Sequence, residues 1–394
     1  MLGIDVLAAN GFREVRGKTI GLLTHPAGVD RFGRSTIDIL HKAPGVKLLA
    51  LFAPEHALSG TVKASANFGD ERHGPTGLPV YSLHGTNRKP TAAQLKGLDA
   101  LVIDLQDIGV RSYTFSVVMR YAMDSCFQHG VEVIVLDRPN PLGGLKVDGP
   151  SLDREWMSGV GAFRIPYVHG LTMGELATMA AQAPGVLDAS VTEAMRKKGR
   201  LTVIKMQGWR RSMRWPETGL DFVPTSPLVR DFPAVIGYAM TGLGCEYSGF
   251  KHGAGKEHPF RAISFKGKTA AQLKSDLEKL KIPGLAYRII TATNTEGKKV
   301  QGLYVDVVDW NAWHPTRLSF ELMRLACRYN PPNPYAKLGP KEMRSFNIHV
   351  GSTAWWLTLL KDGAKVDVAA HDAEWSRRAA LYQEQSKRYW LYQL

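Results

Sequence analysis

Four short runs of apolar, β-forming residues alternate with polar or helical segments in the N-terminal part of the chain. The runs occupy residues 19–24, 47–52, 100–103 and 132–136. Runs that are apolar throughout are typical of strands buried on both faces of a parallel sheet, and parallel strands need crossover connections, usually helices. Apolar residues at helical spacing over residues 115–129 provide one such crossover. The alternation therefore predicts an α/β fold with a mainly parallel sheet.

Polar side chains follow each of the four runs, at the point where the strand should end. In open α/β sheets, ligands bind outside the carboxyl ends of the strands, so such side chains are candidates for a site. One polar strand end would carry little weight, whereas four in succession predict a cleft. The side chains are His25, Glu55, Asp104, Gln106, Asp107, Asp137 and Asn140, with Arg111, Tyr113 and Thr114 close behind the third run.

The chain has 394 residues, too many for one ordinary hydrophobic core, so two domains are expected. The pattern changes character near Pro184, which predicts one domain over residues 1–184, carrying the catalytic loops, and a second α/β domain over residues 185–394. No run approaches ~20 apolar residues, so no transmembrane segment is expected. The N-terminus lacks the pattern of a signal peptide. The three widely spaced cysteines leave the compartment open.

Basic residues exceed acidic ones by 50 to 36, which gives a net charge of +14. An excess of this size favours an anionic partner, such as an acidic sugar polymer or a nucleic acid. Part of it is local, because residues 196–214 hold eight basic residues and no acidic one, and a solvated basic surface is the simplest interpretation. Nucleic-acid binding is the best non-enzymatic alternative. No nucleic-acid-binding motif is visible, however, so no nucleic-acid partner is expected.

The chain lacks the motifs of common cofactor and metal sites. Only Gly28 follows the first run closely, so the GxGxxG fingerprint of dinucleotide binding is absent there. The GAGK segment at 253–256 resembles a phosphate-binding loop, but Phe250 and Glu257 occupy the positions of the required Gly and Ser/Thr. His252 and His258 have no third ligand nearby, which argues against zinc. We expect neither a cofactor nor a metal.

Carboxylates at separate strand ends suit glycoside cleavage. One carboxylic acid must protonate the leaving oxygen, and a second carboxylate usually acts as nucleophile or activates water. Glu55 is the best candidate for the acid, because it follows a buried strand and a proline, where limited solvation would raise its pKa. The structural alternative for Glu55 is an ion pair with Arg111 or Arg138. The candidates for the second carboxylate are Asp104, Asp107, Asp137 and Glu246.

Three segments of the first half form a specific combination: FAPEH at 52–56, DLQDIGVRSYT at 104–114 and DRPNP at 137–141. Shorter segments accompany them, namely GIDVL at 3–7, GLLT at 21–24, GLPVYSL at 77–83, HGLTMGEL at 169–176, PTSP at 224–227 and residues 346–351. Together these segments, spread over nearly the whole chain, resemble the bacterial exo-β-N-acetylmuramidase family.

This resemblance implies a Rossmann-like N-terminal domain without nucleotide, a second α/β domain, and an active site in the cleft between them. It implies removal of terminal β-linked N-acetylmuramic acid, or a related amino sugar, from peptidoglycan fragments. The family's proposed acid falls on Glu55, with Asp107, Asp104 or Glu246 as the second carboxylate. The expected partners are peptidoglycan-derived saccharides or muropeptides, and the oligomeric state is open. Substrate contacts are expected from His25, His56, Gln106, Arg111, Tyr113, Asn140, His169 and His252.

The second half departs from the family pattern. Where the family tends to have EGTNxSEGRGT, this chain has EYSGFKHGAGK at 246–256. Glu246 is kept, but His252 replaces the second glutamate, and Ala254 replaces an arginine that would suit a lactyl carboxylate. These departures leave open an alternative function, a non-catalytic glycan- or muropeptide-binding protein on the same fold. The resemblance implies a periplasmic or secreted protein, and a cytoplasmic location stays open.

Overall fold

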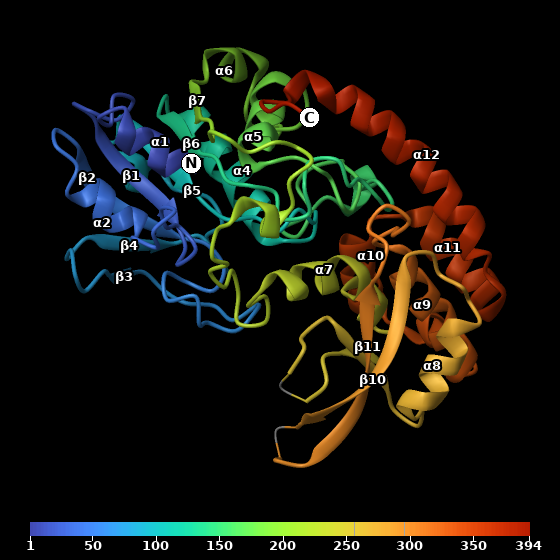
Figure 1. Cartoon of the computed structure of the whole chain (residues 1–394). Helices are drawn as coiled ribbons and strands as arrows, with labels where there is room; N and C mark the ends of the chain where they lie inside the picture. Colours follow the sequence, from blue (N-terminus) through green and yellow to red (C-terminus); the bar gives the residue numbers. More distant parts are fainter. Residues whose placement is uncertain (256, 295) are drawn as a thin grey trace.

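The computed structural model describes residues 1–255, 257–294 and 296–394, which form two packed units (Figure 1). The first unit contains a seven-stranded sheet of order β3-β4-β2-β1-β5-β6-β7. All its strands pair in parallel except β3, which lies antiparallel to β4. The predicted mainly parallel sheet is confirmed, and the four predicted strands match within one residue. The strands are β1 (Thr19–Thr24), β2 (Lys47–Ala53), β3 (Glu71–Arg72), β4 (Pro79–Ser82), β5 (Ala100–Asp104), β6 (Glu132–Leu136) and β7 (Leu201–Ile204).

Helices cover both faces of this sheet, because successive side chains of each buried strand point to opposite faces. Leu22 of β1 belongs to a core shared with α1 (Gly3–Ala9) and α2 (Thr36–His41). Leu23, the next residue, belongs to the core on the other face. The helices of that face are α3 (Ala92–Leu95), α4 (Thr114–Gln128), α5 (Met173–Gln182) and α6 (Glu193–Lys198).

The register of the sheet brings the strand ends to one edge. Leu23 of β1 pairs with Phe52 of β2 and with Ile103 of β5, and Ile103 pairs with Val135 of β6. Counted without β3, the parallel strands follow the 3-2-1-4-5-6 order of a doubly wound Rossmann fold. One detail differs from the sequence-based expectation. The sheet extends to β7, past the boundary predicted at residue 184.

The second unit contains an antiparallel sheet of order β10-β11-β9-β8, packed against helices. The elements are α7 (Phe232–Thr241), β8 (Phe250–His252), β9 (Ala262–Phe265), α8 (Ala270–Glu278), β10 (Leu285–Thr293), β11 (Lys299–Val307), α9 (Arg317–Tyr329), α10 (Pro340–Val350), α11 (Thr353–Asp362) and α12 (Val368–Ser386). Short 3₁₀ turns are η1 (Arg154–Trp156), η2 (Trp215–Thr218), η3 (Leu243–Cys245), η4 (Pro334–Lys337), η5 (Gly363–Lys365) and η6 (Lys387–Tyr389).

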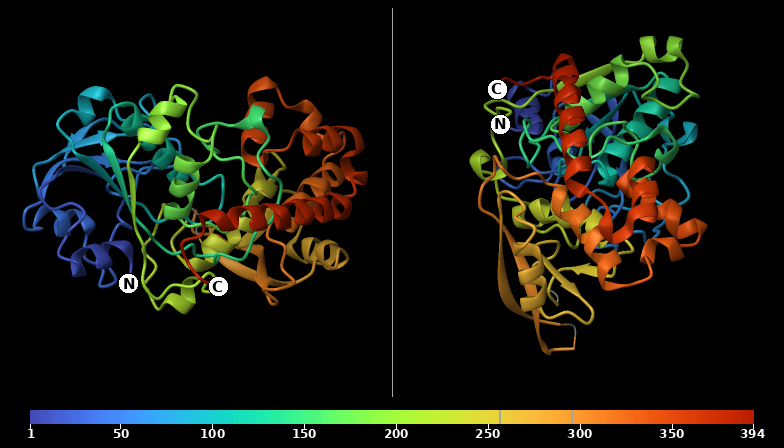
Figure 2. Two further views of the ribbon diagram at one scale, coloured as in Figure 1. Left: turned by 90° about the horizontal axis from the view of Figure 1, so that it is seen from above. Right: turned by 90° about the vertical axis from the view of Figure 1, so that its right-hand side faces the viewer.

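Helix α12 carries the chain from the second unit back to the first, where the chain ends near α5 (Figures 1 and 2). This helix has 19 residues, many of them charged. None of the helices in the described ranges is both long enough and apolar enough to cross a bilayer.

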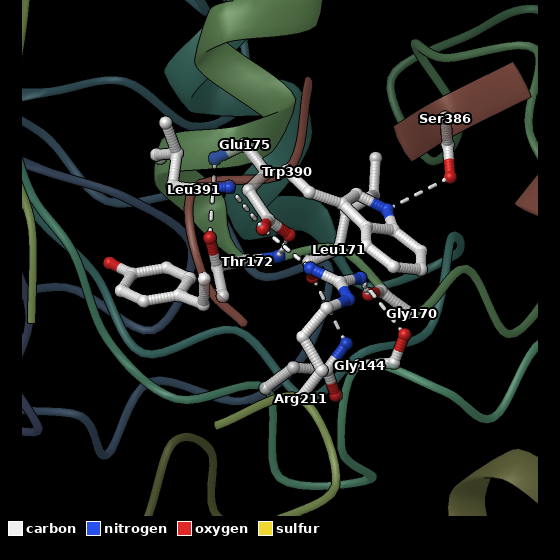
Figure 3. Close-up of polar contacts among 12 residues, drawn as sticks. Gly144, Gly170, Leu171, Thr172, Glu175, Arg211, Ser386, Trp390 and Leu391 are labelled. Atoms are coloured by element: carbon white, nitrogen blue, oxygen red, sulfur yellow. Dashed lines mark hydrogen bonds and ion pairs between the residues drawn. The ribbon is translucent and has the colours of Figure 1, made fainter. Parts of the chain in front are cut away.

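A buried ion pair fastens the C-terminal tail to the first unit (Figure 3). Arg211 donates to Glu175 Oε1 at 2.5 Å and also to two backbone carbonyls. The Trp390 ring lies 3.7 Å from the guanidinium carbon, and the backbone N–H of Leu391 donates to the same Glu175 oxygen at 2.9 Å. Arg211 belongs to the basic stretch predicted to be solvated, so for this member the interpretation is wrong. Burial beside a carboxylate gives it a structural role instead.

A second buried arginine joins the two units directly. Arg111 follows β5 and is 2% exposed. Its Nη1 donates to the carbonyls of Pro150 and Ile165, and its Nη2 donates to those of His349 and Val350 at the end of α10. Burial lowers the pKa of Arg111 to about 10, so it stays charged at neutral pH. Four backbone carbonyls from separate segments are therefore satisfied by one guanidinium.

We expect Arg111→Met to lower the free energy of unfolding by at least about 3 kcal/mol, because four buried carbonyls lose their donor. Urea denaturation followed by circular dichroism measures this loss. The control is Arg72→Met, which removes an exposed arginine that donates to one carbonyl of its own loop, Gly77 O. This control should change the value by no more than about 0.5 kcal/mol. Equal stability of Arg111→Met and the wild type would contradict the structural role.

Candidate active site

Glu55 lies directly after β2, on the residue that follows Pro54. Its Oε1 accepts a hydrogen bond from the backbone N–H of Ser65 at 2.8 Å, and its Oε2 accepts one from Thr114 Oγ1 at 2.9 Å. The Thr114 hydroxyl can donate to a carboxylate or accept from a carboxylic acid, so this contact is compatible with either state. The side chain is 12% exposed, and His84 Nε2 lies 3.9 Å from Oε1. Glu55 has no ion pair with Arg111 or Arg138, which bind other groups.

A cavity of about 550 Å³ opens beside Glu55, between the two units. A smaller hollow of about 140 Å³ shares Glu55 and Thr114 with it and is also lined by Asn67, His84 and Arg88. The carboxyl group of Glu55 thus borders both spaces. The large cavity is lined by Glu55, His56, Lys63, Ala64, Ser112, Tyr113, Thr114, Ser226, Pro227, Leu228, Val229, Arg230, Tyr238 and Phe260.

Aromatic side chains from both units line the large cavity. Tyr113, which follows β5, packs edge-to-face on Tyr238 of α7 at a centroid distance of 5.9 Å, and Tyr238 lies 4.8 Å from Phe260. The Tyr113 hydroxyl donates to Thr225 Oγ1 at 2.8 Å, so it holds the loop before α7 in place. Such rings offer an apolar platform with polar edges, which suits the faces of a sugar.

Tyr238 connects the candidate carboxylates electrostatically. Burial, together with the negative charges of Glu246, Glu55 and Asp107, raises the pKa of its phenol to about 12. The hydroxyl therefore stays protonated at neutral pH and can donate a hydrogen bond. Three carboxylates from separate parts of the chain thus act on one cavity-lining group. These acids are Glu55 and Asp107, from two strand ends, and Glu246, from the segment that departs from the family pattern.

Asp107 and Glu246 differ in their surroundings. Asp107 is 6% exposed. Its Oδ2 accepts a hydrogen bond from the Gly109 N–H at 2.7 Å and lies 3.5 Å from His169 Nε2. Its buried Oδ1 has no hydrogen-bond partner in the described part of the chain. Glu246 ends η3 and is half-buried, and no hydrogen bond or ion pair joins its carboxylate to the described residues. Neither lines the large cavity itself.

Two histidines of the predicted set follow neighbouring strands, His56 after β2 and His25 after β1. His56 lines the cavity with a φ of 76°, and its Nδ1 lies 2.7 Å from Val62 O, so this nitrogen carries the proton. His25 is 2% exposed beneath the same loop, where its Nδ1 accepts from the Ala27 N–H. Burial, with a smaller contribution from His56, lowers the pKa of His25 to about 3. His25 is therefore a neutral supporting group rather than a lining residue.

Two predicted candidates for the second carboxylate are structural. Asp104 is fully buried, accepts from Arg138 Nε and Nη2 at 2.5 and 2.9 Å, and also accepts from Thr36 Oγ1. Asp137 is fully buried and accepts from Tyr392 OH at 2.6 Å, so it anchors the C-terminal tail. Burial raises the pKa of Asp137 to about 6. The structure gives neither carboxylate access to the cavity.

Three residues expected to contact substrate hold the backbone instead. Arg111 binds four carbonyls, as described above. Asn140 donates to Leu171 O at 3.0 Å, and Gln106 donates to the carbonyls of Asp107 and Pro139. All three are at most 3% exposed. Their polar groups follow strand ends because the turns there need donors for buried carbonyls.

His169 and His252 lie outside the lining of the cavity. His169 is 1% exposed, and its Nδ1 accepts from the Leu171 N–H. His252 stacks on Phe260 at a centroid distance of 4.0 Å, so it supports one wall from behind. Ala254 is 2% exposed in a small cluster with other alanines. Lys256, the last residue of the departing segment, lies outside the described residues.

The nucleotide position of a Rossmann fold is filled by side chains. It lies between the ends of β1 and β5, where Asp104 binds Arg138 and Thr36. The nearby hollow measures about 70 Å³, far less than typical ligand pockets of about 300 Å³ or more. These residues do not fit a nucleotide.

One cluster in the described ranges has the composition of a metal site. Asp148, His314 and Asp372 offer ligand atoms within 4.8 Å of one another. Asp148 Oδ2 already accepts two hydrogen bonds from Thr316, and Asp372 Oδ2 lies 3.4 Å from both His314 Nδ1 and Arg317 Nη1. Arg317 already supplies a cation there, and the cluster is separate from the Glu55 cavity.

The sequence-based prediction missed Tyr238 as a site residue and gave Thr114 no specific role. Tyr238 lies on α7, a helix that was not predicted, although Asp231 followed by Pro233 is a recognisable helix start. Thr114 was noted only as part of a polar turn. Its contact with Glu55 joins residues 59 positions apart, and no local pattern encodes such a distance.

Two family descriptions match the chain. The family described as Exo-beta-N-acetylmuramidase NamZ, N-terminal, matches residues 20–233, and the one described as Exo-beta-N-acetylmuramidase NamZ, C-terminal, matches residues 236–392. The chain is 34% identical over 395 residues to the peptidoglycan beta-N-acetylmuramidase NamZ of Bacillus subtilis (strain 168), and the match covers 99% of this chain and 91% of that protein.

Two crystal structures of DUF1343 family proteins from Bacteroides fragilis NCTC 9343 share the fold. The first has a TM-score of 0.87 at 35% identity and covers 100% of this chain and 98% of that chain. The second has a TM-score of 0.73 at 26% identity and covers 100% of this chain and 99% of that chain. The two matched family regions meet near the start of α7.

We expect His25 to make stability depend on pH. The unfolded chain protonates this residue near pH 6.5 and the folded chain only near pH 3, so its stabilising contribution is present above pH 6.5 and is lost as pH falls toward 3. From pH 7.5 to pH 5 the wild type should lose about 2 kcal/mol more than His25→Asn. Urea denaturation at both pH values measures this difference, with the exposed His41→Asn as control. Parallel losses in wild type and His25→Asn would contradict it.

Proposed function

The chain belongs to the exo-β-N-acetylmuramidase NamZ family, and from this premise we propose that Glu55 is the general acid of its reaction. The reaction is removal of terminal β-linked N-acetylmuramic acid from peptidoglycan fragments. The single observation that supports the proposal most is the position of Glu55 in the wall of the cavity between the two units, with hydrogen bonds to Ser65 and Thr114.

The geometry suits acid catalysis for a physical reason. A general acid must present a carboxylic proton to the leaving oxygen and must not be locked in an ion pair. Both hydrogen-bond partners of Glu55 are neutral, whereas Asp104 is locked against Arg138. The terminal sugar would lie in the large cavity against the rings of Tyr113 and Tyr238, with its glycosidic oxygen at Glu55.

The second carboxylate is Asp107 or Glu246 in this proposal. Both charges act on Tyr238, and among the residues that the structure describes neither carboxylate is bound to an arginine or a lysine. Asp107 is positioned by the Gly109 N–H, whereas Glu246 is half-buried and accessible. Whichever of the two attacks the sugar or activates water, its loss should slow both kinds of substrate, because a good leaving group replaces the proton from the acid but not the attacking group.

We expect Glu55→Gln to lower kcat by about 10²- to 10⁴-fold on a MurNAc–GlcNAc disaccharide, because the amide cannot protonate the leaving oxygen. On an aryl β-N-acetylmuramide the loss should be at least tenfold smaller, since a phenolate leaves without full protonation. Release of free N-acetylmuramic acid measures both rates. Glu71→Gln, an exposed substitution on β3, is the control and should keep wild-type rates.

The same pair of substrates separates the remaining roles. Asp107→Asn and Glu246→Gln should reduce the two rates by equal factors if the residue is the second carboxylate. If Glu55→Gln lowers the rates on both substrates by the same factor, Glu55 is the nucleophile rather than the acid. Binding of muropeptides by the wild type without any turnover would instead support the non-catalytic alternative.

A further inference from the structure

Two cations line the large cavity. Lys63 comes from the loop after β2, and Arg230 comes from the loop before α7. Both side chains are exposed, and neither forms an ion pair with an acid among the described residues. The Arg230 Nε donates to Pro227 O at 2.6 Å, which fixes the base of the guanidinium and leaves its two terminal nitrogens available. An acidic group in the cavity could therefore form ion pairs with both side chains.

The substrate of the proposed function carries one such acidic group. N-Acetylmuramic acid differs from N-acetylglucosamine by a lactyl ether that ends in a carboxylate. A guanidinium fork matches the geometry of a carboxylate, and a lysine adds a point charge. Ala254 stands at the position of the family's arginine and is buried in an alanine cluster, so it supplies no cation.

We infer that Lys63 and Arg230 together bind the lactyl carboxylate of the terminal sugar. This inference rests on the proposed function and adds the residues that select the sugar. The two loops also carry the catalytic contacts. The loop of Lys63 includes Ser65, whose N–H holds Glu55, and the loop of Arg230 leads into the helix of Tyr238. A carboxylate held between them would fix the sugar relative to the acid.

The inference has a consequence for the form of the substrate. In intact muropeptides the lactyl group is amide-linked to a peptide and carries no charge at that position. Two cations beside a neutral amide would lose their ionic partner, so the free acid should be preferred. A hydrogen bond between charged groups contributes about 1.5–3 kcal/mol, which corresponds to roughly 10- to 100-fold in binding.

The test compares aryl β-N-acetylmuramide with the same compound bearing a lactyl methylamide. The wild type should show a kcat/KM about 10- to 100-fold higher for the acid, mainly through a lower KM. In the double variant Lys63→Gln/Arg230→Gln the preference should vanish, so that the ratio of kcat/KM for the acid to kcat/KM for the amide falls to about one. The matched control is Lys266→Gln/Arg72→Gln. It removes one exposed lysine and one exposed arginine outside the cavity and should keep the preference.

The outcomes separate the two proposals. Turnover by the wild type with an acid preference that the double variant retains would overturn the role of these cations and leave the proposed function intact. Absence of turnover for both compounds would overturn the proposed function. In that case, titration calorimetry with free N-acetylmuramic acid would still test whether Lys63 and Arg230 bind the carboxylate. Weaker binding by the double variant than by the control supports the inference, and equal binding refutes it.

Discussion

The guanidinium of Arg111 is the contact on which the arrangement of the two units depends. It extends from the turn after β5, the turn that also carries Asp107 and Tyr113, and satisfies four carbonyls from three separate segments. Gly351, with a φ of 82°, leaves no room for a Cβ beside this group. Because the cavity lies between the units, this contact helps to hold its walls in place, together with the hydrogen bonds from Lys146 to Trp310 and from Thr316 to Asp148.

The chemistry of the site follows from a contrast in how acids are partnered. Asp104 and Asp137 are fully buried and tightly bound, one to an arginine and the other to the C-terminal tail. Within the described ranges Glu55 accepts hydrogen bonds from two neutral groups, the Ser65 N–H and the Thr114 hydroxyl, and it remains partly exposed at the cavity. A carboxylate held in an ion pair loses its freedom to exchange a proton, whereas one held by hydroxyl and amide groups keeps it. The role of an acid therefore depends on the groups that bind its carboxylate, and not on its position after a strand.

Most polar residues of the family motifs stabilise the fold, and only a few of them line the cavity. In the DLQDIGVRSYT segment, Asp104, Gln106 and Arg111 bind backbone or buried partners, while Tyr113 and Thr114 reach the cavity. Such a turn has to satisfy many buried backbone groups before it can position two side chains. This explains why residues chosen for their polarity near strand ends divide into lining residues and supports. It also explains why the specificity inferred above falls on exposed loop residues outside these motifs.

The local sequence pattern determined the parallel sheet, its four central strands and the position of Glu55 at a strand end. The alternation of apolar runs and helices is visible in neighbouring residues, so it can be predicted without tertiary contacts. The family, too, followed from contiguous motifs. Tertiary structure alone decided that β7 joins the first sheet, that Tyr238 lines the cavity with Glu55, and that Arg111 binds four backbone carbonyls. These facts depend on contacts between residues far apart in the chain. Burial and partnership arise only when such segments pack together, so no single stretch of sequence contains them.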